Sequence, residues 1–367
     1  MAQKNWGGPH RFFGAGGAPI GEQPPRRPPG GKKPPPRARG RLSEVPVRVQ
    51  GVARRAALPD FLRAYAEARA QGPWFFMFTD DDYRDGSSFD PLLNTWHHIP
   101  LPALPRDETF FPAASAGGLI CFGCYADGWK TFVVCNPLTR VWRQLPSMLN
   151  PPFRLHTVGM VVDADTTSYK VLVAGNSDIY EVYDSATNCW EKTCIIPPGF
   201  YRWHQGILCN GFLYSKRFEF DGLVAYDMVE GVWSKIQAPM PHAFDYHALV
   251  ECQGHIYTVG GQMKNDVTKQ ICILQLERTS LQWIEVDSMP KILFEEFLKD
   301  GESFSCAGYS DLVMLYIPGG LKDRLVLLYD LIKKLWRRLP QCTLPEHCMQ
   351  DGLLDGISFE PRLDAVV

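Results

Sequence analysis

The chain has 367 residues, of which 45% are apolar and 21% are charged, and its net charge at pH 7 is −2. This length allows a large hydrophobic core, and the near-neutral charge makes nucleic acid an unlikely partner. No stretch approaches the roughly 18 consecutive apolar residues of a membrane span. We therefore expect a soluble protein of the cytoplasm and/or the nucleus, with no membrane partner.

The 11 cysteines are scattered through apolar runs. Their odd number, without a secretory leader, favours reduced and buried thiols. Only Cys121 and Cys124 have a spacing typical of metal ligands, and no second pair of ligands accompanies them. We expect structural thiols at these positions, and the sequence predicts neither a metal site nor a cofactor.

Residues 1–45 are rich in proline, glycine and arginine. The first 40 residues contain nine prolines, nine glycines and eight lysines or arginines, against one acid, Glu22. Such a composition buries too little apolar surface to offset the entropy of ordering, so a disordered arm is expected. Its basic run at 26–41 fits a nuclear-import signal or a weak nucleic-acid arm, and it also fits a solvated leader without a specific partner.

Residues 46–72 differ from this arm and are expected to hold a short linking helix. Within 59–71 apolar residues recur at helical spacing, at Phe61, Leu62, Tyr65 and Ala68. Pro59 and Asp60 suit a helix start, and the Gln-Gly-Pro run at 71–73 would end the helix.

From residue 73 onward, short runs of aromatic and β-branched residues alternate with turn-forming residues. One hairpin pattern recurs six times, with tryptophans 46, 48, 43, 50 and 53 residues apart: Trp96, Trp142, Trp190, Trp233, Trp283 and Trp336. Six positions before each tryptophan stands a residue that can open a turn: Asp90, Asn136, Asp184, Asp227, Glu277 and Asp330. Each indole is expected to start the returning strand and to pack between neighbouring sheets.

Six hairpins, preceded in the complete repeats by an inner pair of strands, predict an all-β fold: a six-bladed β-propeller over residues 73–364. The first repeat lacks an innermost strand. The run DGISFEP at 355–361 follows the last complete repeat and is expected to fill that place. Such a closure would leave no open sheet edge and would join both ends of the domain.

The Tyr-Asp-(x)5-Trp hairpin and the Gly260–Gly261 pair resemble kelch repeats, and the stretches at 71–80 and 356–365 resemble plant F-box/kelch-repeat proteins. The resemblance covers roughly residues 59–364. It implies a kelch-type propeller that binds an unknown target protein. It also implies that the chain is the non-catalytic substrate-recognition subunit of a Skp–cullin–F-box type ubiquitin ligase.

In this family an amino-terminal F-box docks the Skp-type adaptor of the cullin ligase. The stretch at 47–65 resembles the tail of an F-box, but VARRA at 52–56 stands where the family has Val-Cys-Arg-x-Trp. The F-box is therefore expected to be degenerate or missing. The residues expected to remain of an adaptor-binding surface are Val49, Val52, Phe61 and Leu62.

Three histidines lie at the same sequence distance from a repeat tryptophan. His156, His204 and His247 each follow such a tryptophan by 14 residues. They are expected to begin innermost strands near one mouth of the central channel. They could form a three-histidine metal site or hydrogen-bond neighbouring blades, and the lack of matched carboxylates favours the second reading. Arg154 and Arg202 make this mouth basic, which favours recognition of an acidic peptide or a small anion.

The most elaborate connections supply the other candidate target-binding residues. Trp129, Phe294 and Phe297 lie in them and are natural anchors if exposed, although each can equally pack against its own blade.

The sequence does not predict an enzyme, since no Ser-His-Asp grouping, phosphate-binding glycine loop or pair of catalytic carboxylates stands out. Two alternatives to the ligase subunit stay open. One is a kelch-propeller scaffold or decoy that binds targets without ligase assembly. The other, from a different class, is a metal-dependent kelch enzyme that uses the histidine mouth.

Overall fold

The six predicted hairpins are present in the computed structural model, where each supplies the two outer strands of a four-stranded antiparallel sheet. In each hairpin the side chain six positions before the tryptophan accepts hydrogen bonds from turn amides. The residue two positions before each tryptophan has positive φ: Asn94, Arg140, Asn188, Gly231, Leu281 and Lys334. One turn geometry therefore returns the chain in all six repeats.

The structure describes Gly72 and residues 74–78, 86–101, 109–125, 129–151, 155–163, 167–175, 180–193, 206–217, 222–241, 244–264, 267–298, 304–318, 325–342 and 355–367. For some strand residues, among them His156 and His247, only the backbone is described. The chain divides into two units, residues 1–48 and 49–367, and all described residues belong to the second. The predicted arm at 1–45 and, apart from Gly72, the linking segment at 46–72 lie outside the described residues.

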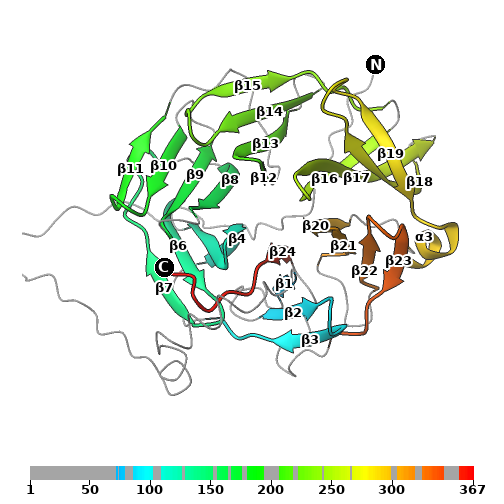
Figure 1. The fold of residues 1–367 in the computed structure, drawn as a ribbon, viewed down its shortest axis with the longest axis horizontal. Coiled ribbons are helices and arrows are strands. Elements are labelled where there is room, and N and C mark those ends of the chain that lie inside the picture. The colour runs from blue at the N-terminus through cyan, green and yellow to red at the C-terminus, as the bar shows by residue number, and fades with distance from the viewer. Residues whose placement is uncertain are drawn as a thin grey trace, which may run out of the picture. The chain divides into compact units, whose positions relative to one another are not determined.

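The sheets form six blades around a central channel (Figure 1). From the innermost strand outward, the first blade consists of β24 (Asp355–Phe359), β1 (Trp74–Phe78), β2 (Gly86–Asp90) and β3 (Thr95–His98). The second consists of β4 (Thr109–Ala116), β5 (Leu119–Tyr125), β6 (Trp129–Asn136) and β7 (Val141–Gln144). The third consists of β8 (Leu155–Val162), β9 (Tyr169–Gly175), β10 (Tyr180–Asp184) and β11 (Cys189–Lys192).

The remaining blades follow the same order. The fourth consists of β12 (Ile207–Cys209), β13 (Phe212–Arg217), β14 (Gly222–Asp227) and β15 (Trp233–Ile236). The fifth consists of β16 (Phe244–Cys252), β17 (His255–Lys264), β18 (Val267–Leu276) and β19 (Trp283–Ser288), followed by helix α3 (Lys291–Phe297). The sixth consists of β20 (Ser305–Tyr309), β21 (Leu312–Tyr316), β22 (Leu327–Asp330) and β23 (Leu335–Arg338). None of the described helices is long and apolar enough to cross a membrane.

The core is divided into apolar clusters, one at each boundary between neighbouring blades. At the boundary of the second and third blades, the rings of Phe132 and Trp190 lie 5.9 Å apart. The predicted packing of repeat tryptophans between sheets is confirmed at this boundary. Because both faces of each blade are covered in this way, each blade depends on its two neighbours for burial of its apolar surface.

Three repeat tryptophans also join neighbouring blades by a hydrogen bond. The indole Nε1 donates to a backbone carbonyl just after the outermost strand of the preceding blade, at 2.7 to 3.1 Å: Trp96 to Pro340, Trp190 to Pro146 and Trp283 to Ala238. The bond of Trp96 connects the first blade to the sixth and therefore acts across the closure of the ring.

Helix α3 interrupts this pattern between the fifth and sixth blades. Pro290 corresponds to Pro146 and Pro340, because each follows a residue whose amide donates to a carbonyl in the third strand of its blade or directly before it. The Pro290 carbonyl instead accepts from the Phe294 amide at 2.9 Å and so begins α3. The buried Nε1 of Trp336 has no hydrogen-bond partner among the described residues. The helix therefore replaces an inter-blade hydrogen bond.

The innermost place in the first blade is filled by the C-terminal segment, where the sequence analysis expected it. β24 pairs antiparallel with β1 from Asp355↔Phe78 to Phe359↔Trp74. The sixth blade holds one end of β24, since the Tyr316 hydroxyl donates to Asp355 Oδ1 at 2.8 Å. The second blade holds the other end, since Ser115 Oγ donates to the Ser358 carbonyl at 2.5 Å. β24 thus connects three blades.

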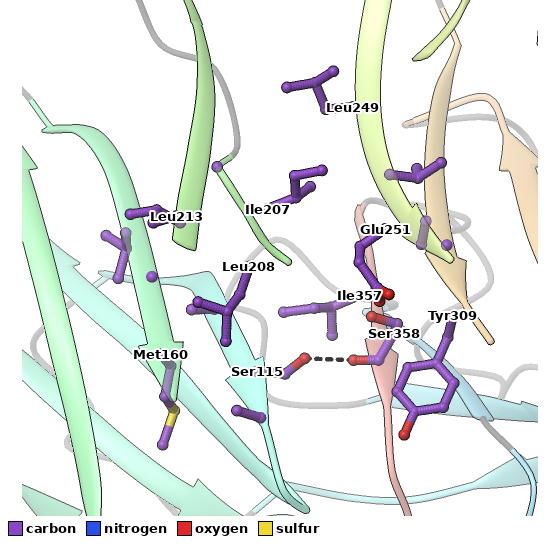
Figure 2. Close-up of a pocket in the computed structure, with 18 of the residues that line it drawn as sticks. Ser115, Met160, Ile207, Leu208, Leu213, Leu249, Glu251, Tyr309, Ile357 and Ser358 are labelled. Atoms are coloured by element: carbon purple, nitrogen blue, oxygen red, sulfur yellow. Dashed lines mark hydrogen bonds between the residues drawn. The ribbon is translucent and has the colours of Figure 1, made fainter. Parts of the chain in front are cut away.

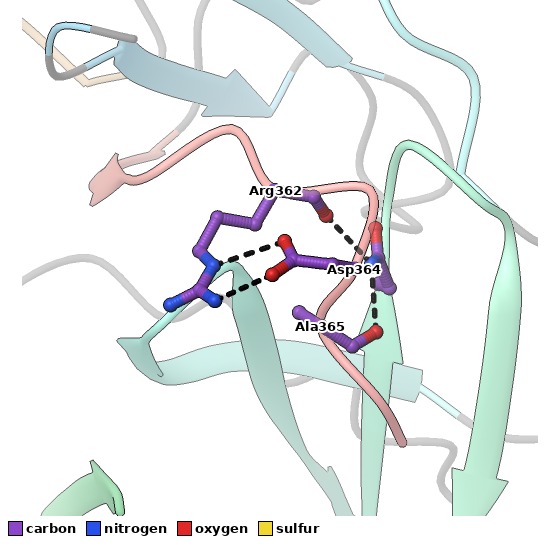
Figure 3. A network of polar contacts seen from close by, with 4 residues as sticks. Arg362, Asp364 and Ala365 are labelled. Carbon is purple, nitrogen blue, oxygen red and sulfur yellow. Dashed lines mark hydrogen bonds and ion pairs between the residues drawn. The ribbon is translucent and has the colours of Figure 1, made fainter. Parts of the chain in front are cut away.

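Beyond β24, the last residues of the chain are fixed to the second blade (Figure 3). The Asn136 amide donates to the Arg362 and Ala365 carbonyls at 2.8 and 3.0 Å. Arg362 and Asp364 form a two-point ion pair, and Ala365 packs on the cluster between the second and third blades. Asn136 replaces the acid of the other repeats because this site needs a donor for two carbonyls, and a carboxylate can only accept.

The tryptophan hydrogen bond can be tested with two matched variants. Trp96 and Trp336 are both half-buried, and only Trp96 has an acceptor for Nε1 among the described residues. We expect Trp96→Phe to lower the free energy of unfolding by about 1 kcal/mol more than Trp336→Phe. Urea unfolding of both variants measures this difference, and equal losses would contradict a stabilising role for the bond to Pro340.

The role of Asn136 can be tested by exchanging acid and amide between repeats. We expect Asn136→Asp to lower the free energy of unfolding by about 1–3 kcal/mol, because it places a buried carboxylate against two carbonyls. The control Asp184→Asn keeps its side-chain oxygen for the Ala186 amide and should have little effect. Carboxypeptidase digestion should shorten Asn136→Asp faster than the control, and equal rates would show that Asn136 does not hold the C-terminus.

Candidate functional site

The connections of the propeller fall on two faces, because neighbouring strands in each blade are antiparallel. Short turns such as 117–118, 253–254 and 310–311 follow the innermost strands and lie on one face, which we call the turn face. The innermost strands begin on the opposite face, which we call the loop face. The chain leaves one blade and enters the next there, and the spans between these strand ends are longer, as at 145–154 and 289–304.

A cavity of about 250 Å³ occupies the central channel (Figure 2). All six innermost strands or their flanking residues line it, and one wall residue from each blade is Ser115, Gly159, Leu208, Glu251, Ala307 or Ser358. Small residues dominate this wall, including the whole run 113–117, and they leave room at the axis where six strands converge. A space of this size is suited to a side chain or a small polar group rather than to a large cofactor.

The turn-face end of the cavity is acidic. Glu251, next to the last residue of β16, accepts a hydrogen bond from the Gly254 amide at 2.6 Å. Burial raises the pKa of the Glu251 carboxyl, against smaller lowering effects of the Gly254 bond and of His255. Burial and then the charges of Glu360 and Glu251 raise the pKa of Tyr309 to about 12, against a lowering effect of Arg362. A negative charge at this end therefore disfavours a second anion nearby.

Only part of the predicted loop-face site is described. His156 and His247 lie near the starts of β8 and β16, and each is the extra residue of a β-bulge. A bulge changes the direction of the side chain that it carries, and bulges are frequent beside binding sites. Arg154, Arg202 and His204 lie outside the described residues.

The two bulged histidines do not lie at one height along the channel. The third and fifth blades can be aligned at the first amide after the outermost strand, which donates to the third strand in both. When the strand pairs are followed inward from this hydrogen bond, they lead to Thr157 in the third blade and to Asp245 in the fifth. These two residues therefore lie at the same level along the channel. Because a bulged residue falls between two pairing levels, His156 stands about half a step before this level and His247 about one and a half steps after it. The two backbone positions are therefore roughly 7 Å apart along the strand direction. Equal distance from the tryptophan therefore does not place these histidines in one ring, which argues against a three-histidine metal site.

The predicted aromatic anchors differ in burial. Trp129 is the first residue of β6, and its side chain is not described. Phe294 is half-buried on α3, whereas Phe297 is only 2% exposed and packs against Phe304 with ring centroids 6.0 Å apart. Leu293 and Phe297, four residues apart, form the buried side of α3. Phe297 therefore belongs to the core, and this corrects its assignment to a binding surface.

The predicted adaptor-binding remnant, Val49, Val52, Phe61 and Leu62, lies outside the described residues.

The Cys121–Cys124 pair cannot share a metal ion in this fold. Both residues lie on β5, where residues three positions apart face opposite sides of the sheet. Cys121 packs in the cluster between the second and third blades, and Cys124 in the cluster between the first and second. Burial raises the pKa of Cys121, which keeps it a neutral thiol. The described residues contain no group of three potential metal-binding side chains.

Sequence analysis missed two polar residues that the fold places close to the channel. Glu251 stands three residues before Gly254, a spacing that fits an acid closing its own turn, and this was the available signal. Thr157 is 3% exposed and gave no signal, because its environment depends on packing against the next blade.

Comparisons with known proteins agree with the fold. A family model described as the F-box associated beta propeller domain matches residues 64–351. F-box only protein 6 of Arabidopsis thaliana is 34% identical over 310 residues, which cover 82% of this chain and 66% of that protein. The chain therefore spans slightly less than two thirds of that relative's length.

Two further Arabidopsis thaliana proteins are similar to this chain. Protein UNUSUAL FLORAL ORGANS is 28% identical over 314 residues, covering 78% of this chain and 69% of that protein. An F-box/kelch-repeat protein is 27% identical over 334 residues, covering 80% of this chain and 78% of that protein.

The raised pKa of Glu251 predicts a dependence of stability on pH. A carboxyl whose pKa is higher in the folded than in the unfolded state destabilises the fold when ionised, and this cost disappears once both states are protonated. Glu251→Gln keeps an acceptor for Gly254 without the charge. We expect its melting temperature to exceed that of the wild type at pH 8, with a difference that shrinks toward pH 4.5. A difference independent of pH would contradict the burial argument.

Proposed function

We propose that this chain, which belongs to the F-box associated beta propeller family, is the target-recognition subunit of a Skp–cullin–F-box type ubiquitin ligase. In this proposal the propeller binds the target protein without catalysing a reaction, in the cytoplasm and/or the nucleus. The match of the family model to residues 64–351 carries the proposal, because this domain accompanies an F-box by description. The names of the relatives support the same role.

The two faces of the propeller suit two partners. β1 begins at Trp74, opposite the end of β24, and therefore on the turn face. Gly72 packs against Leu92 in an outer-hairpin turn of that face, where a Cβ atom would lie 3.2 Å from Leu92 Cδ1. In this proposal the adaptor is held on the turn-face side and leaves the loop face free. The target is then expected on the loop face, where the longer connections provide variable surface.

A scaffold or decoy is the second candidate, and one observation favours it. VARRA at 52–56 lacks the tryptophan that the family carries in its F-box. In that case the propeller would bind the same targets without delivering them to a ligase.

Adaptor binding distinguishes the two candidates. We expect purified full-length protein to retain a recombinant plant Skp-type adaptor in a pull-down, and a variant lacking residues 1–58 to lose it. Thermal unfolding of both proteins must first show that the propeller is folded. Retention by neither folded protein would contradict the ligase role and leave the scaffold.

A further inference from the structure

The central cavity contains a carboxylate that the fold does not need. Glu251 stands two residues before the inner turn of the fifth blade, and its carboxylate accepts one hydrogen bond from another described residue, the Gly254 amide. The same position is Ser115, Leu208 or Gly308 in the second, fourth and sixth blades. All four blades form a two-residue turn whose first residue has positive φ. Three of these turns form without an acid, so the carboxylate requires another explanation.

Two negative charges meet at this end of the cavity. Glu251 and Glu360 both line it, and Figure 2 shows the Glu251 side chain extending from β16 toward the channel. Both carboxylates contribute to the raised pKa of Tyr309, which lines the same cavity, so both charges lie close to one hydroxyl. The described residues of the cavity wall include no lysine, arginine or histidine.

The positively charged groups that act on this end do not neutralise it. Arg362 lowers the pKa of Tyr309, but its guanidinium is held in the two-point ion pair with Asp364. His255 lowers the pKa of Glu251 less than burial raises it, and His255 is exposed, where water screens its charge. The turn-face end of the cavity therefore keeps a net negative charge.

The remaining side chains of the cavity wall are mostly apolar. Ile207, Leu208, Leu249 and Ile357 line it together with Met160 (Figure 2). Burial of an alkyl chain against such side chains is favourable. A calcium ion takes about six to eight oxygen ligands. Among the described residues no three potential metal-binding side chains form a group. An apolar cavity with an acidic end therefore matches an organic cation with an alkyl chain better than a divalent metal ion.

We propose that the central cavity binds an aliphatic primary ammonium group, with the charge at Glu251 and the alkyl chain against Leu208 and Ile357. The ammonium donates to Glu251 Oε2, because Oε1 already accepts from the Gly254 amide. Ser358, next to the last residue of β24, supplies a second acceptor from the opposite wall of the same cavity. The ammonium belongs either to a free amine or to a lysine side chain of another protein. The site is a property of the propeller and does not rest on the proposed ligase role.

Calorimetric titration of the full-length protein tests this site with defined probes at neutral pH and constant ionic strength. Butylammonium chloride represents a free amine, and a capped pentapeptide with one central lysine represents a protein side chain. Butanol and sodium butyrate keep the alkyl chain and remove or invert the charge. We expect saturable binding of at least one of the two amines. Butanol and butyrate should bind at least about tenfold more weakly, because only the ammonium forms a hydrogen bond between two charged groups.

Three variants separate the charge of the cavity from its shape. Glu251→Gln keeps an acceptor for Gly254 without the charge and should weaken binding of the amine at least about tenfold. Leu208→Phe keeps the carboxylate, fills part of the cavity and should also weaken binding. Glu191→Gln removes an exposed carboxylate of β11 outside the cavity and should bind like the wild type. Thermal unfolding first shows which variants are folded. If Leu208→Phe is not, the comparison of the two glutamine variants decides.

Several results would overturn the proposal. Binding of neither amine would do so, as would equal affinities of the wild type and Glu251→Gln. Equal affinities for butylammonium and butanol would show an apolar cavity that does not recognise charge. Displacement of the amine by Ca²⁺ or Mg²⁺ at lower concentrations than the amine itself requires would assign the acids to a metal ion. None of these results depends on whether the protein retains the adaptor.

Discussion

The antiparallel pairing of β24 with β1 brings residues 355–359 against residues 74–78 and completes the first blade. The other blades depend on this pairing because no blade buries its apolar faces alone. Without β24 the cluster between the first and second blades would lose Ile357 and Phe359, and the closing contacts of Tyr316 and Ser115 would have no partner. The ring is therefore closed by two segments that are far apart in the sequence, which makes the whole core a long-range structure.

The blades were predictable because their information is local. A turn-forming side chain, a left-handed residue and an indole stand within seven positions of one another, and each acts on its own hairpin. The residue with positive φ could be predicted from the sequence where it is Asn94 or Gly231, because these residue types adopt positive φ readily. It could not be predicted at Leu281, where the turn geometry overrides the preference of a branched side chain. The sequence showed only that Asn136 stands where the other repeats have an acid. The role of its amide could not be predicted, because the two carbonyls that accept its hydrogen bonds lie more than 200 residues away in the sequence.

The channel was less predictable, because its geometry depends on several blades at once. Counting from each tryptophan treats the connections between blades as equal, but bulges and connections of unequal length place His156 and His247 at different heights. The repeat likewise gives no sign that α3 would take the carbonyl of Pro290 or bury Phe297. The surroundings of Thr157 depend on Gly206, a residue of the next blade that no local pattern connects with it.

Closing the ring requires a fixed backbone, whereas binding different targets requires a surface that can vary. The propeller meets these two requirements largely on opposite faces. The C-terminal residues, the tight turns and the chain that enters β1 all meet the turn face, where hydrogen bonds from Asn136 and the pair of Arg362 and Asp364 fix the backbone. Among the described residues, the loop face takes part in this closure at the start of β24 and at Pro340, which accepts the hydrogen bond from Trp96. Its connections can therefore vary in length and side chain at little cost to the core, which is the condition for a surface that changes its target while the fold stays the same.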